Sequence, residues 1–386
     1  MSAAPPSPAL RDRAPRSAPV VFYILHSGNL YGTERMALAT LEGMDEYERR
    51  VVFSPFSPGH ASVRQAAVSA GFEAVRFDSR WGLVKALVPW FFRYGAIDVI
   101  ATGVVHSVVC HALSRTFGVR LRQLHVAHGG TADSFDRKHV LNRIPLVMVA
   151  VSEYVRQQLV QCGVHAEGIT VIDNFLSSAQ RGEYARRAAY DTAEGSARPL
   201  DRSRVKVAIV SRVDAIKKVD LLVEAAETFG LHEFQFDIFG TGDQFHQLRQ
   251  RAESLPNLHF HGFVSDIKDR LAEADVLLHL CPQEPFGLVV LEAFLAGVVA
   301  IVADTGGVST LVDDGVTGLK FKANDVADLY RVLQHARQMA PCELQALVDR
   351  ATAQLDARYS EVEGVRRYRR ALEDAGLRKR LRPVAL

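Results

Sequence analysis

The sequence predicts an α/β protein built from parallel sheets in two units of similar size. Short, almost uninterrupted apolar runs recur along the chain, as expected for parallel strands that are buried on both faces. Helical patterns lie between these runs, and the alternation of strand with helix favours parallel sheets. A polar stretch near the middle of the chain separates the two series. The runs are Val20–Leu25, Val99–Ala101, Leu146–Val151, Val205–Val210, Phe234–Phe239, Val276–Leu280 and Val298–Val302.

The helices and the domain boundaries follow from the same patterns. Over residues 219–230, apolar side chains repeat with a helical period and Gly230 supplies a stop signal. The polar residues between the two series are typical of an interdomain linker. We therefore expect a flexible tail at 1–19, a first domain at 20–185, a linker at 186–204, a second domain at 205–360, and a C-terminal helix and tail at 361–386.

Composition excludes several classes of protein. The chain has 386 residues, of which 48% are hydrophobic and 23% charged, as in ordinary soluble globular proteins. Lys plus Arg exceed Asp plus Glu by 46 − 44 = 2, so the net charge does not favour a nucleic-acid partner. The four cysteines are far apart and lack zinc-site spacing. Reduced thiols and a cytoplasmic location are the expectation.

The apolar stretch LVKALVPWFF over residues 83–92 is too short to span a bilayer, and residues 1–19 lack the apolar run of a signal peptide. Two interpretations of the stretch remain open. It is either a helix that faces the core or a weak peripheral contact with the inner membrane face. The second is suggested by aromatic and basic residues, namely Arg80, Trp81, Lys85, Trp90, Phe91, Phe92 and Arg93, with further cations at Arg115, Arg120, Arg122, Arg137 and Lys138.

One segment of the second unit combines two carboxylates with a predicted helix start. In QEPFGLVVLEAFLAG, Glu284 precedes a helix expected to begin near Phe286 or Gly287, and Glu292 lies eight residues after Glu284. The amides of Phe286, Gly287 and Leu288 at this helix start are donors without intrahelical acceptors, and they suit an anion or sugar hydroxyls. The alternative is that Glu284 only stabilises the helix dipole.

Two cations follow the predicted strand Val205–Val210. Arg212 and Lys217 occur in SRVDAIKKVD, between that strand and the next helix. Cations at the carboxyl end of a strand predict a diphosphate site, where they would stabilise a departing nucleoside diphosphate. A solvated run of charges is the alternative, although Arg212 adjoins an apolar strand and not a polar loop.

Together these segments resemble the retaining glycosyltransferases of the GT4 group. Arg212 and Lys217 match the family pattern Gly-Arg-Leu-x-x-x-Lys-Gly. About 70 residues later the family has Glu-x-Phe-Gly-x-x-x-x-Glu-Ala, which Glu284, Phe286, Gly287, Glu292 and Ala293 match. The resemblance is strong over residues 205–330 and looser elsewhere. Its turns are matched by Phe239-Gly240-Thr241-Gly242, His261-Gly262-Phe263-Val264, Gly306-Gly307 and Asp314-Gly315-Val316-Thr317-Gly318.

The likeness is thinner in the first unit. The sequence YGTE, in which Tyr31 replaces a glycine, looks like the Gly-Gly-x-Glu loop of the family. We expect Thr33 to cap the next helix and Gly32 to let a phosphate approach the backbone. His128, at the end of the strand-like run LHVAHG, resembles the family histidine that faces the donor sugar. His125 is expected inside the strand.

Four positions depart from the family pattern. Ser211 and Lys218 replace glycines of the first motif, Phe175 replaces the glycine after Asn174, and Thr310 stands where many members have Glu. None of these changes removes a group that the chemistry needs. They indicate a divergent subfamily.

The resemblance implies the GT-B fold, in which two Rossmann-like domains with parallel sheets face each other across a central cleft. The first domain would bind the acceptor and the second the nucleotide sugar. The implied reaction moves a hexose from a UDP- or GDP-sugar to a hydroxyl of a glycan, a lipid-linked molecule or a small molecule, with retention of anomeric configuration. A nucleotide-sugar 2-epimerase and a non-catalytic sugar-nucleotide-binding protein remain the alternatives.

The resemblance also implies roles for individual residues. Arg212 and Lys217 would clamp the diphosphate, while Glu284 and His128 would hold the sugar ring. Glu292 would bind the ribose hydroxyls. No metal ion or other cofactor is expected, because Asp313-Asp314 belongs to a turn and the two cations can neutralise the diphosphate. The remaining donor-binding residues would be Gly32, Thr33, Val264, Phe286, Gly287 and Leu288.

Overall fold

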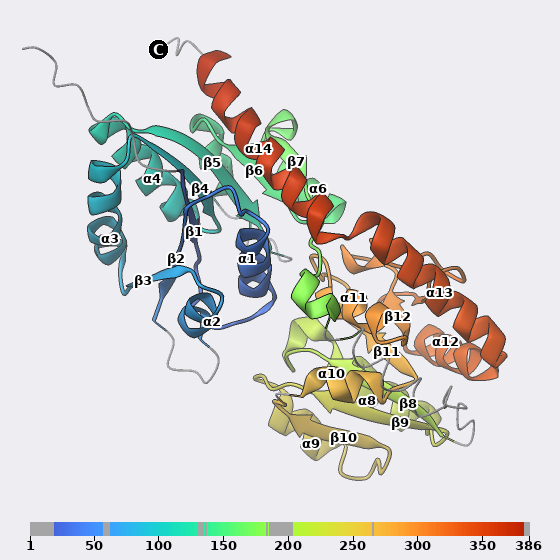
Figure 1. Ribbon diagram of the computed structural model, residues 1–386. Helices are drawn as coiled ribbons and strands as arrows, with labels where there is room; N and C mark the ends of the chain where they lie inside the picture. The colour runs from blue at the N-terminus through green and yellow to red at the C-terminus, as the bar shows by residue number, and fades with distance from the viewer. Residues whose placement is uncertain are drawn as a thin grey trace, which may run out of the picture.

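The fold is that of a computed structural model, which describes residues 19–56, 62–129, 135, 137–182, 184, 204–264 and 266–381. Nearly all of the predicted tail and linker lies outside these residues. The described chain forms two parallel sheets with alternating helices (Figure 1). The predicted α/β class with two Rossmann-like domains is therefore confirmed.

The first sheet has seven parallel strands in the order β3-β2-β1-β4-β5-β6-β7. β1 lies inside the sheet, between β2 and β4, and is buried along its whole length, which explains its unbroken apolar sequence. The chain reverses its direction of winding between β1 and β4. The strands are β1 (Val20–Ile24), β2 (Arg49–Pro55), β3 (Glu73–Phe77), β4 (Ala96–Ala101), β5 (Arg120–Ala127), β6 (Val147–Ala150) and β7 (Ile169–Val171).

The second sheet has six parallel strands in the order β10-β9-β8-β11-β12-β13. This is the doubly wound order of a dinucleotide-binding domain, with its switch point between β8 and β11. The strands are β8 (Val205–Val210), β9 (Phe234–Phe239), β10 (Leu258–Gly262), β11 (Val276–His279), β12 (Val299–Ala303) and β13 (Leu319–Phe321).

Helices connect the strands and cover both sheets. The predicted helix over 219–230 is α8, which ends at Gly230 with a left-handed φ of 78°. The helices are α1 (Gly32–Glu42), α2 (Val63–Ser69), α3 (Arg80–Arg93), α4 (Val104–Phe117), α6 (Glu153–Gln161), α8 (Val219–Phe229), α9 (Phe245–Arg251), α10 (Ile267–Ala272), α11 (Leu288–Leu295), α12 (Val326–Gln338), α13 (Pro341–Arg358) and α14 (Glu361–Leu381). Single 3-10 turns are η1 (Lys138–Arg143), η2 (Ala166–Gly168), η3 (Ala215–Lys217) and η4 (Val308–Thr310).

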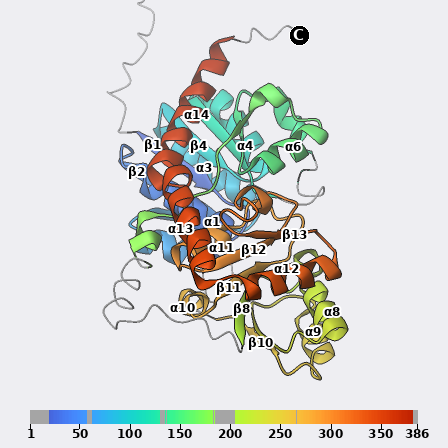
Figure 2. The same ribbon diagram turned by 90° about the vertical axis from the view of Figure 1, so that its right-hand side faces the viewer.

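The last helix returns to the first sheet. α13 lies with the second sheet, whereas α14 continues along β5, β6 and α1 of the first (Figures 1 and 2). Its apolar side is buried there, including Val365, Tyr368 and Leu372. One apolar core consequently runs from the first sheet through α14 to α11 and β12 of the second.

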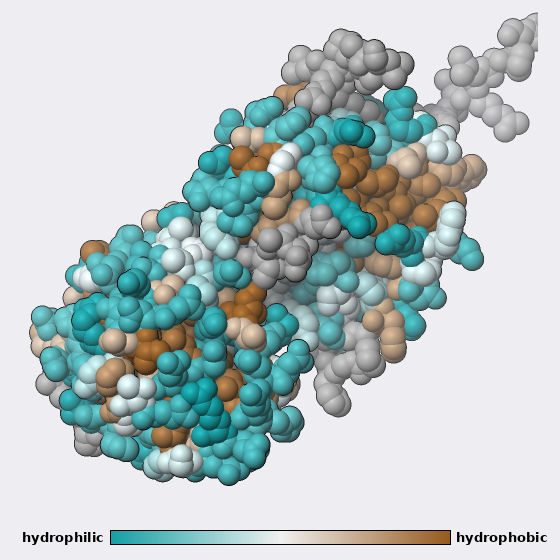
Figure 3. All heavy atoms as spheres, turned by 180° about the vertical axis from the view of Figure 1, so that it is seen from behind, coloured by the Kyte–Doolittle hydropathy of each residue, from teal (hydrophilic) through white to brown (hydrophobic). Residues whose placement is uncertain are grey.

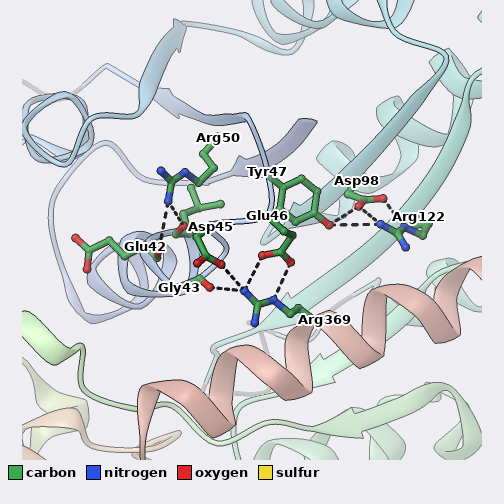
Figure 4. Close-up of polar contacts among 10 residues, drawn as sticks. Glu42, Gly43, Asp45, Glu46, Tyr47, Arg50, Asp98, Arg122 and Arg369 are labelled. Carbon is green, nitrogen blue, oxygen red and sulfur yellow. Dashed lines mark hydrogen bonds and ion pairs between the residues drawn. The ribbon is translucent and has the colours of Figure 1, made fainter. Parts of the chain in front are cut away.

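Polar contacts fix α14 at the loop that follows α1. The guanidinium of Arg369 donates to the Glu46 carboxylate at 2.6 and 2.7 Å, to Asp45 at 2.9 Å and to the Gly43 carbonyl at 2.7 Å (Figure 4). Nearby, Tyr47 and Arg122 both donate to the carboxylate of Asp98 (Figure 4). These charge-assisted hydrogen bonds fix the orientation of α14, which apolar packing alone specifies less strictly.

No helix among the described residues combines the length and the apolar character that crossing a membrane requires. The apolar stretch near residue 90 forms part of α3, which packs Leu83, Leu87 and Phe91 against the first sheet. The ring of Trp90 packs edge-on against Phe22 at 5.4 Å. The first of the two interpretations of this stretch therefore holds for these side chains.

Candidate active site

The candidate site lies at the switch point of the second sheet. At the carboxyl ends of β8 and β11 the chain leaves the sheet in opposite directions, and ligands of doubly wound folds bind in the resulting crevice. The segment after β8 carries Arg212 and Lys217, and the segment after β11 carries Glu284. The two segments that the sequence singled out are thus neighbours in space.

An ion pair joins these two segments. The ammonium of Lys217 lies 2.6 Å from Glu284 Oε2, and His279 Nε2, at the end of β11, lies 3.5 Å from the same oxygen. The Lys217 and Glu284 side chains are only 18% and 15% exposed. The lysine predicted to bind the diphosphate and the glutamate predicted to bind the sugar therefore form an ion pair with each other.

Electrostatics keep both members of this pair charged. Burial raises the pKa of Glu284, but Lys217 and His279 outweigh it and hold this pKa well below its usual range. Burial lowers the pKa of Lys217, while the Glu284 carboxylate outweighs that effect and raises it. The charged lysine offers hydrogen-bond donors and the carboxylate offers acceptors to a ligand at this position.

The helix start predicted near Phe286 or Gly287 is confirmed. α11 begins at Leu288 after Gly287, whose φ of 96° is left-handed and favours glycine. The first amides of α11 are without helical acceptors and point toward the carboxyl edge of the sheet. The side chain of Phe286 is buried and packs edge-on against Tyr359 at 5.9 Å, so only its backbone is left to contact a ligand.

Glu292 lies on α11 at the boundary with the first unit. It is 9% exposed, and Arg35 of α1 lies 3.7 Å from its carboxylate. Burial raises the pKa of Glu292, whereas Arg35 and Lys268 lower it by a smaller amount. A buried carboxylate that has only a loose ion pair retains acceptor capacity for hydroxyl groups.

Glycine turns hold these segments together. A Cβ at Gly307 would lie 1.8 Å from the carbonyl oxygen of Pro285, and a Cβ at Gly240 would lie 1.9 Å from that of Ser211. The Gly307 amide also donates to the Glu284 carbonyl at 2.7 Å. The glycines matched by resemblance thus let the backbone pack directly against the site segments.

In the first unit the structure corrects the predicted cap of α1. The helix begins at Gly32 with Tyr31 as N-cap, so Thr33 lies inside the first turn and cannot cap it. The Glu34 carboxylate instead accepts the Tyr31 amide at 3.2 Å. A Cβ on Gly32 would lie 3.5 Å from Leu288 Cδ1, which places the glycine loop of the first unit against the start of α11.

The histidines at the carboxyl edge of the first sheet are neutral. His125 is inside β5 as predicted, fully buried and 2.9 Å from Ser107 Oγ. His128 follows β5, and its Nε2 is buried without a hydrogen-bond partner among the described residues. Burial, with smaller effects from His26 and Lys138, lowers the pKa of His128 to about 3. His128 lies beside these N-terminal side chains and makes no described hydrogen bond to the second unit.

Two further predicted residues lie apart from the ion pair. Arg212 is 61% exposed and pairs with Asp214 at 2.8 Å. Val264 follows β10 and packs partly against the core, next to Phe263, which is 72% exposed. The Arg212 side chain is thus accessible to a ligand, whereas Val264 is partly buried.

Sequence reasoning missed three residues that join the site together. Only their position at a strand end or near a helix start could have indicated them in the sequence, and many other residues share such positions. His279 contacts Glu284, Arg35 contacts Glu292, and the Ser152 hydroxyl donates to the Pro285 carbonyl at 2.6 Å. The last two cross between the units, and no short motif can reveal such contacts.

Among the described residues, no cluster of three or more His, Cys, Asp or Glu side chains is arranged to hold a metal ion. Asp313 and Asp314 lie in a turn, where the Asp313 carbonyl accepts from the Thr317 amide and the Asp314 carboxylate accepts from the Lys320 amide.

The fold and this site define a two-domain α/β architecture of the GT-B type. Residues 196–343 match the family model described as glycosyl transferases group 1. A glycogen synthase from Thermodesulfovibrio yellowstonii is 33% identical over 120 residues, which cover 30% of this chain and 24% of that protein. An uncharacterized 41.2 kDa protein in the cps region of Klebsiella pneumoniae is 25% identical over 188 residues, covering 48% of this chain and 50% of that one. The chain thus spans half the length or less of these curated relatives.

Solved structures resemble the whole fold. A crystal structure of HepE from Anabaena, in complex with UDP and glucose, has a TM-score of 0.74 at 19% identity and covers 92% of this chain and 99% of its own. A sucrose-phosphate synthase from Thermosynechococcus elongatus has a TM-score of 0.71 at 16% identity, with 92% and 98% covered. At these identities the likeness establishes the fold.

Proposed function

We propose that this chain is a glycosyltransferase that moves a sugar from a nucleoside-diphosphate sugar to an acceptor hydroxyl, with retention of anomeric configuration and without a metal ion. The observation that carries the proposal is the buried Lys217–Glu284 pair at the switch point, beside the first amides of α11. The family match over residues 196–343 covers this segment. The glycogen synthase relatives and the UDP-bound structural neighbour support a nucleotide-sugar donor.

In the proposed reaction the bond between the anomeric carbon and the diphosphate oxygen breaks. The acceptor oxygen bonds to the same face of that carbon, and its proton passes to the leaving phosphate. Lys217, Arg212 and the α11 amides stabilise the charge that develops on the diphosphate. Glu284, released from Lys217, accepts hydrogen bonds from the sugar hydroxyls, and neutral His128 can donate or accept one bond at the sugar ring.

Glu292 and the end of β10 would bind the nucleoside. The carboxylate of Glu292 can accept bonds from both ribose hydroxyls, and Val264 would lie near the base. Gly32 would let the backbone of the first unit approach the phosphates, with Thr33 in the same turn. Each of these assignments is part of the proposal.

Donor turnover tests the proposal. Incubation with a panel of UDP- and GDP-sugars, without acceptor, should release free nucleoside diphosphate slowly, because a transferase lets water act as a poor acceptor. Recovery of the donor with an epimerised sugar would indicate an isomerase, and unchanged donor would indicate a binding protein. Once an acceptor is found, proton NMR of the first product should show the anomeric configuration of the donor.

Metal independence is tested in the same assay. Arg212 and Lys217 replace a divalent cation at the diphosphate, so turnover should persist in excess EDTA. Loss of turnover that added Mn²⁺ restores would contradict this part of the proposal.

A further inference from the structure

The outer side of α3 carries two exposed aromatic side chains. Trp81 is 76% exposed and Phe92 is 81% exposed, although α3 buries its opposite side in the core. At 100° per residue, positions 81, 85, 88 and 92 lie within a narrow arc of the helix. We call Trp81, Lys85, Val88 and Phe92 the α3 face. Single exposed apolar residues are ordinary, but two large aromatic rings on one helical face are not.

The α3 face lies in a local field of positive charge. α3 and α4 pack against each other and together contain Arg80, Lys85, Arg93 and Arg115 but no Asp or Glu. Asp78 borders this layer just before α3. The small net charge of the whole chain therefore conceals a cationic layer on this side of the first sheet.

Several aromatic and basic residues of the first unit do not contribute to this layer. Phe91 is 1% exposed, Arg122 is paired with Asp98, and Lys138 is 8% exposed beside Phe135. The aromatic contribution is thus confined to Trp81 and Phe92.

Apolar surface is also found close to α3, away from the α3 face itself. Viewed from behind, apolar side chains gather on the outer side of the N-terminal half, where α3 and α4 cover the sheet (Figure 3). A cavity of about 270 Å³ opens beside the start of α3, with Phe77, Leu83, Val104 and Val105 among its lining residues and Arg80 beside them. Such a cavity can accept the apolar part of a molecule whose anionic group binds Arg80.

We propose that the α3 face is a docking surface for anionic lipid. Trp81 and Phe92 insert at the headgroup level, where amphipathic and aromatic rings are favoured, and Arg80, Lys85 and Arg93 bind the anionic headgroups. Pro89, also on the exposed side, frees the Lys85 carbonyl from its helical bond, and headgroups or water can satisfy it. If the proposed transferase function holds, docking here favours an acceptor carried on a lipid.

The protein provides its own probe for this proposal. It contains two tryptophans, Trp81 and Trp90, so the Trp90→Phe variant reports on Trp81 alone. With vesicles of phosphatidylglycerol at about 50 mM salt, where charges are weakly screened, Trp81 emission should shift to shorter wavelength. Vesicles of phosphatidylcholine should cause no shift. An unchanged spectrum with the anionic vesicles would overturn the proposal.

Flotation of the unmodified protein provides an independent measurement. We expect it to rise with phosphatidylglycerol vesicles at low salt and to remain at the bottom at high salt. In the double variant Trp81→Ser/Phe92→Ser the floated fraction should fall about tenfold, because the two inserting rings are removed. Both side chains are exposed, so their removal leaves the core intact. The matched control Val362→Ser/Arg249→Glu changes an equally exposed apolar residue and an exposed cation elsewhere, and it should float like the parent protein.

The outcomes are distinguishable. Equal flotation of the two double variants would overturn the proposal. So would a shift of Trp81 emission that appears when the protein concentration is raised without vesicles, because it would indicate that a second copy of the chain binds this face. Release of nucleoside diphosphate from a donor should be the same in both variants. A failure of the transferase proposal would appear there and not in flotation.

Discussion

The two halves of the molecule hold their site residues in different ways. In the C-terminal half, Lys217 and Glu284 are paired at 2.6 Å, and the loop that carries Glu284 packs directly against the Gly307 backbone. In the N-terminal half, His128 has a buried nitrogen without a described partner, and Gly32 has only an ordinary contact with Leu288. The Lys217–Glu284 pair of the C-terminal half is thus preorganised, whereas His128 of the N-terminal half keeps a ring nitrogen that a ligand can satisfy.

The largest effect is expected at the ion pair. Lys217→Met removes the cation proposed to stabilise the departing diphosphate and leaves the Glu284 carboxylate beside His279. Turnover of donor should fall about 10²- to 10³-fold, as when one preorganised donor is removed. The measurement is release of nucleoside diphosphate under saturating donor.

The matched control is Lys206→Met, which changes a lysine at the opposite end of β8. Circular dichroism should show both variants folded. If a folded Lys217→Met protein turned over donor at a rate within threefold of the parent, the Lys217–Glu284 pair would not be a preorganised part of the catalytic site.

Next in size is the response to added methyl groups. Gly307→Ala places its Cβ 1.8 Å from the Pro285 carbonyl oxygen and 2.8 Å from Ser152 Oγ, so the backbone must move. We expect a loss of about 3 kcal/mol in the free energy of unfolding, at the upper end of overpacking effects. Gly32→Ala meets only Leu288 Cδ1 at 3.5 Å and should change stability by less than about 1 kcal/mol.

Urea denaturation of the two variants measures this difference. Gly182→Ala, where a Cβ meets nothing within 4 Å, serves as the reference without a steric contact. Equal losses for Gly307→Ala and Gly32→Ala would show that the two halves do not differ in how closely their backbones are packed.

A third prediction concerns pH and the first turn of α1. Glu34 is 1% exposed, and burial raises its pKa from 4.5 to about 7 although the Tyr31 amide acts in the opposite direction. The folded state therefore retains this proton where the unfolded state has lost it. The contribution of Glu34 to the free energy of unfolding is fully present below about pH 4.5 and is lost as the pH rises to about 7.

Glu34→Gln should remove that loss, because an amide oxygen can still accept the Tyr31 amide and carries no charge to desolvate. At pH 8 the variant should be more stable than the parent by about 3 kcal/mol, and near pH 4.5 the difference should disappear. Glu153→Gln is the control, since its salt bridge with Arg156 lowers the pKa of Glu153 and no gain at pH 8 is expected. A gain independent of pH would contradict the mechanism.

The sequence predicted the C-terminal half well because its information is local. Strand-end cations, a helix start at Gly287 and several glycine turns each occupy a few consecutive residues, and their neighbours in space follow from the parallel fold. The N-terminal half depends on contacts between distant segments, such as Ser152 with Pro285 and α14 with the first sheet. The cap of α1 shows the same limit. Thr33 has the residue type of a cap, but the N-cap is Tyr31, two residues earlier, and the Glu34 carboxylate accepts the Tyr31 amide.

The smallest predicted effect explains one departure from the family pattern. Lys218 stands where the family pattern that the sequence resembles has glycine, and its φ of 58° is in the left-handed region that costs a non-glycine residue about 1 kcal/mol. Lys218→Gly should relieve this strain and raise the free energy of unfolding by about 0.5–1 kcal/mol, partly offset by the greater freedom of glycine in the unfolded chain. Asn324→Gly, at a φ of 60°, should gain less, because asparagine tolerates this conformation. Urea midpoints of the two variants measure the difference, and a larger gain at Asn324 would show that backbone strain does not account for the glycine that the family pattern has at position 218.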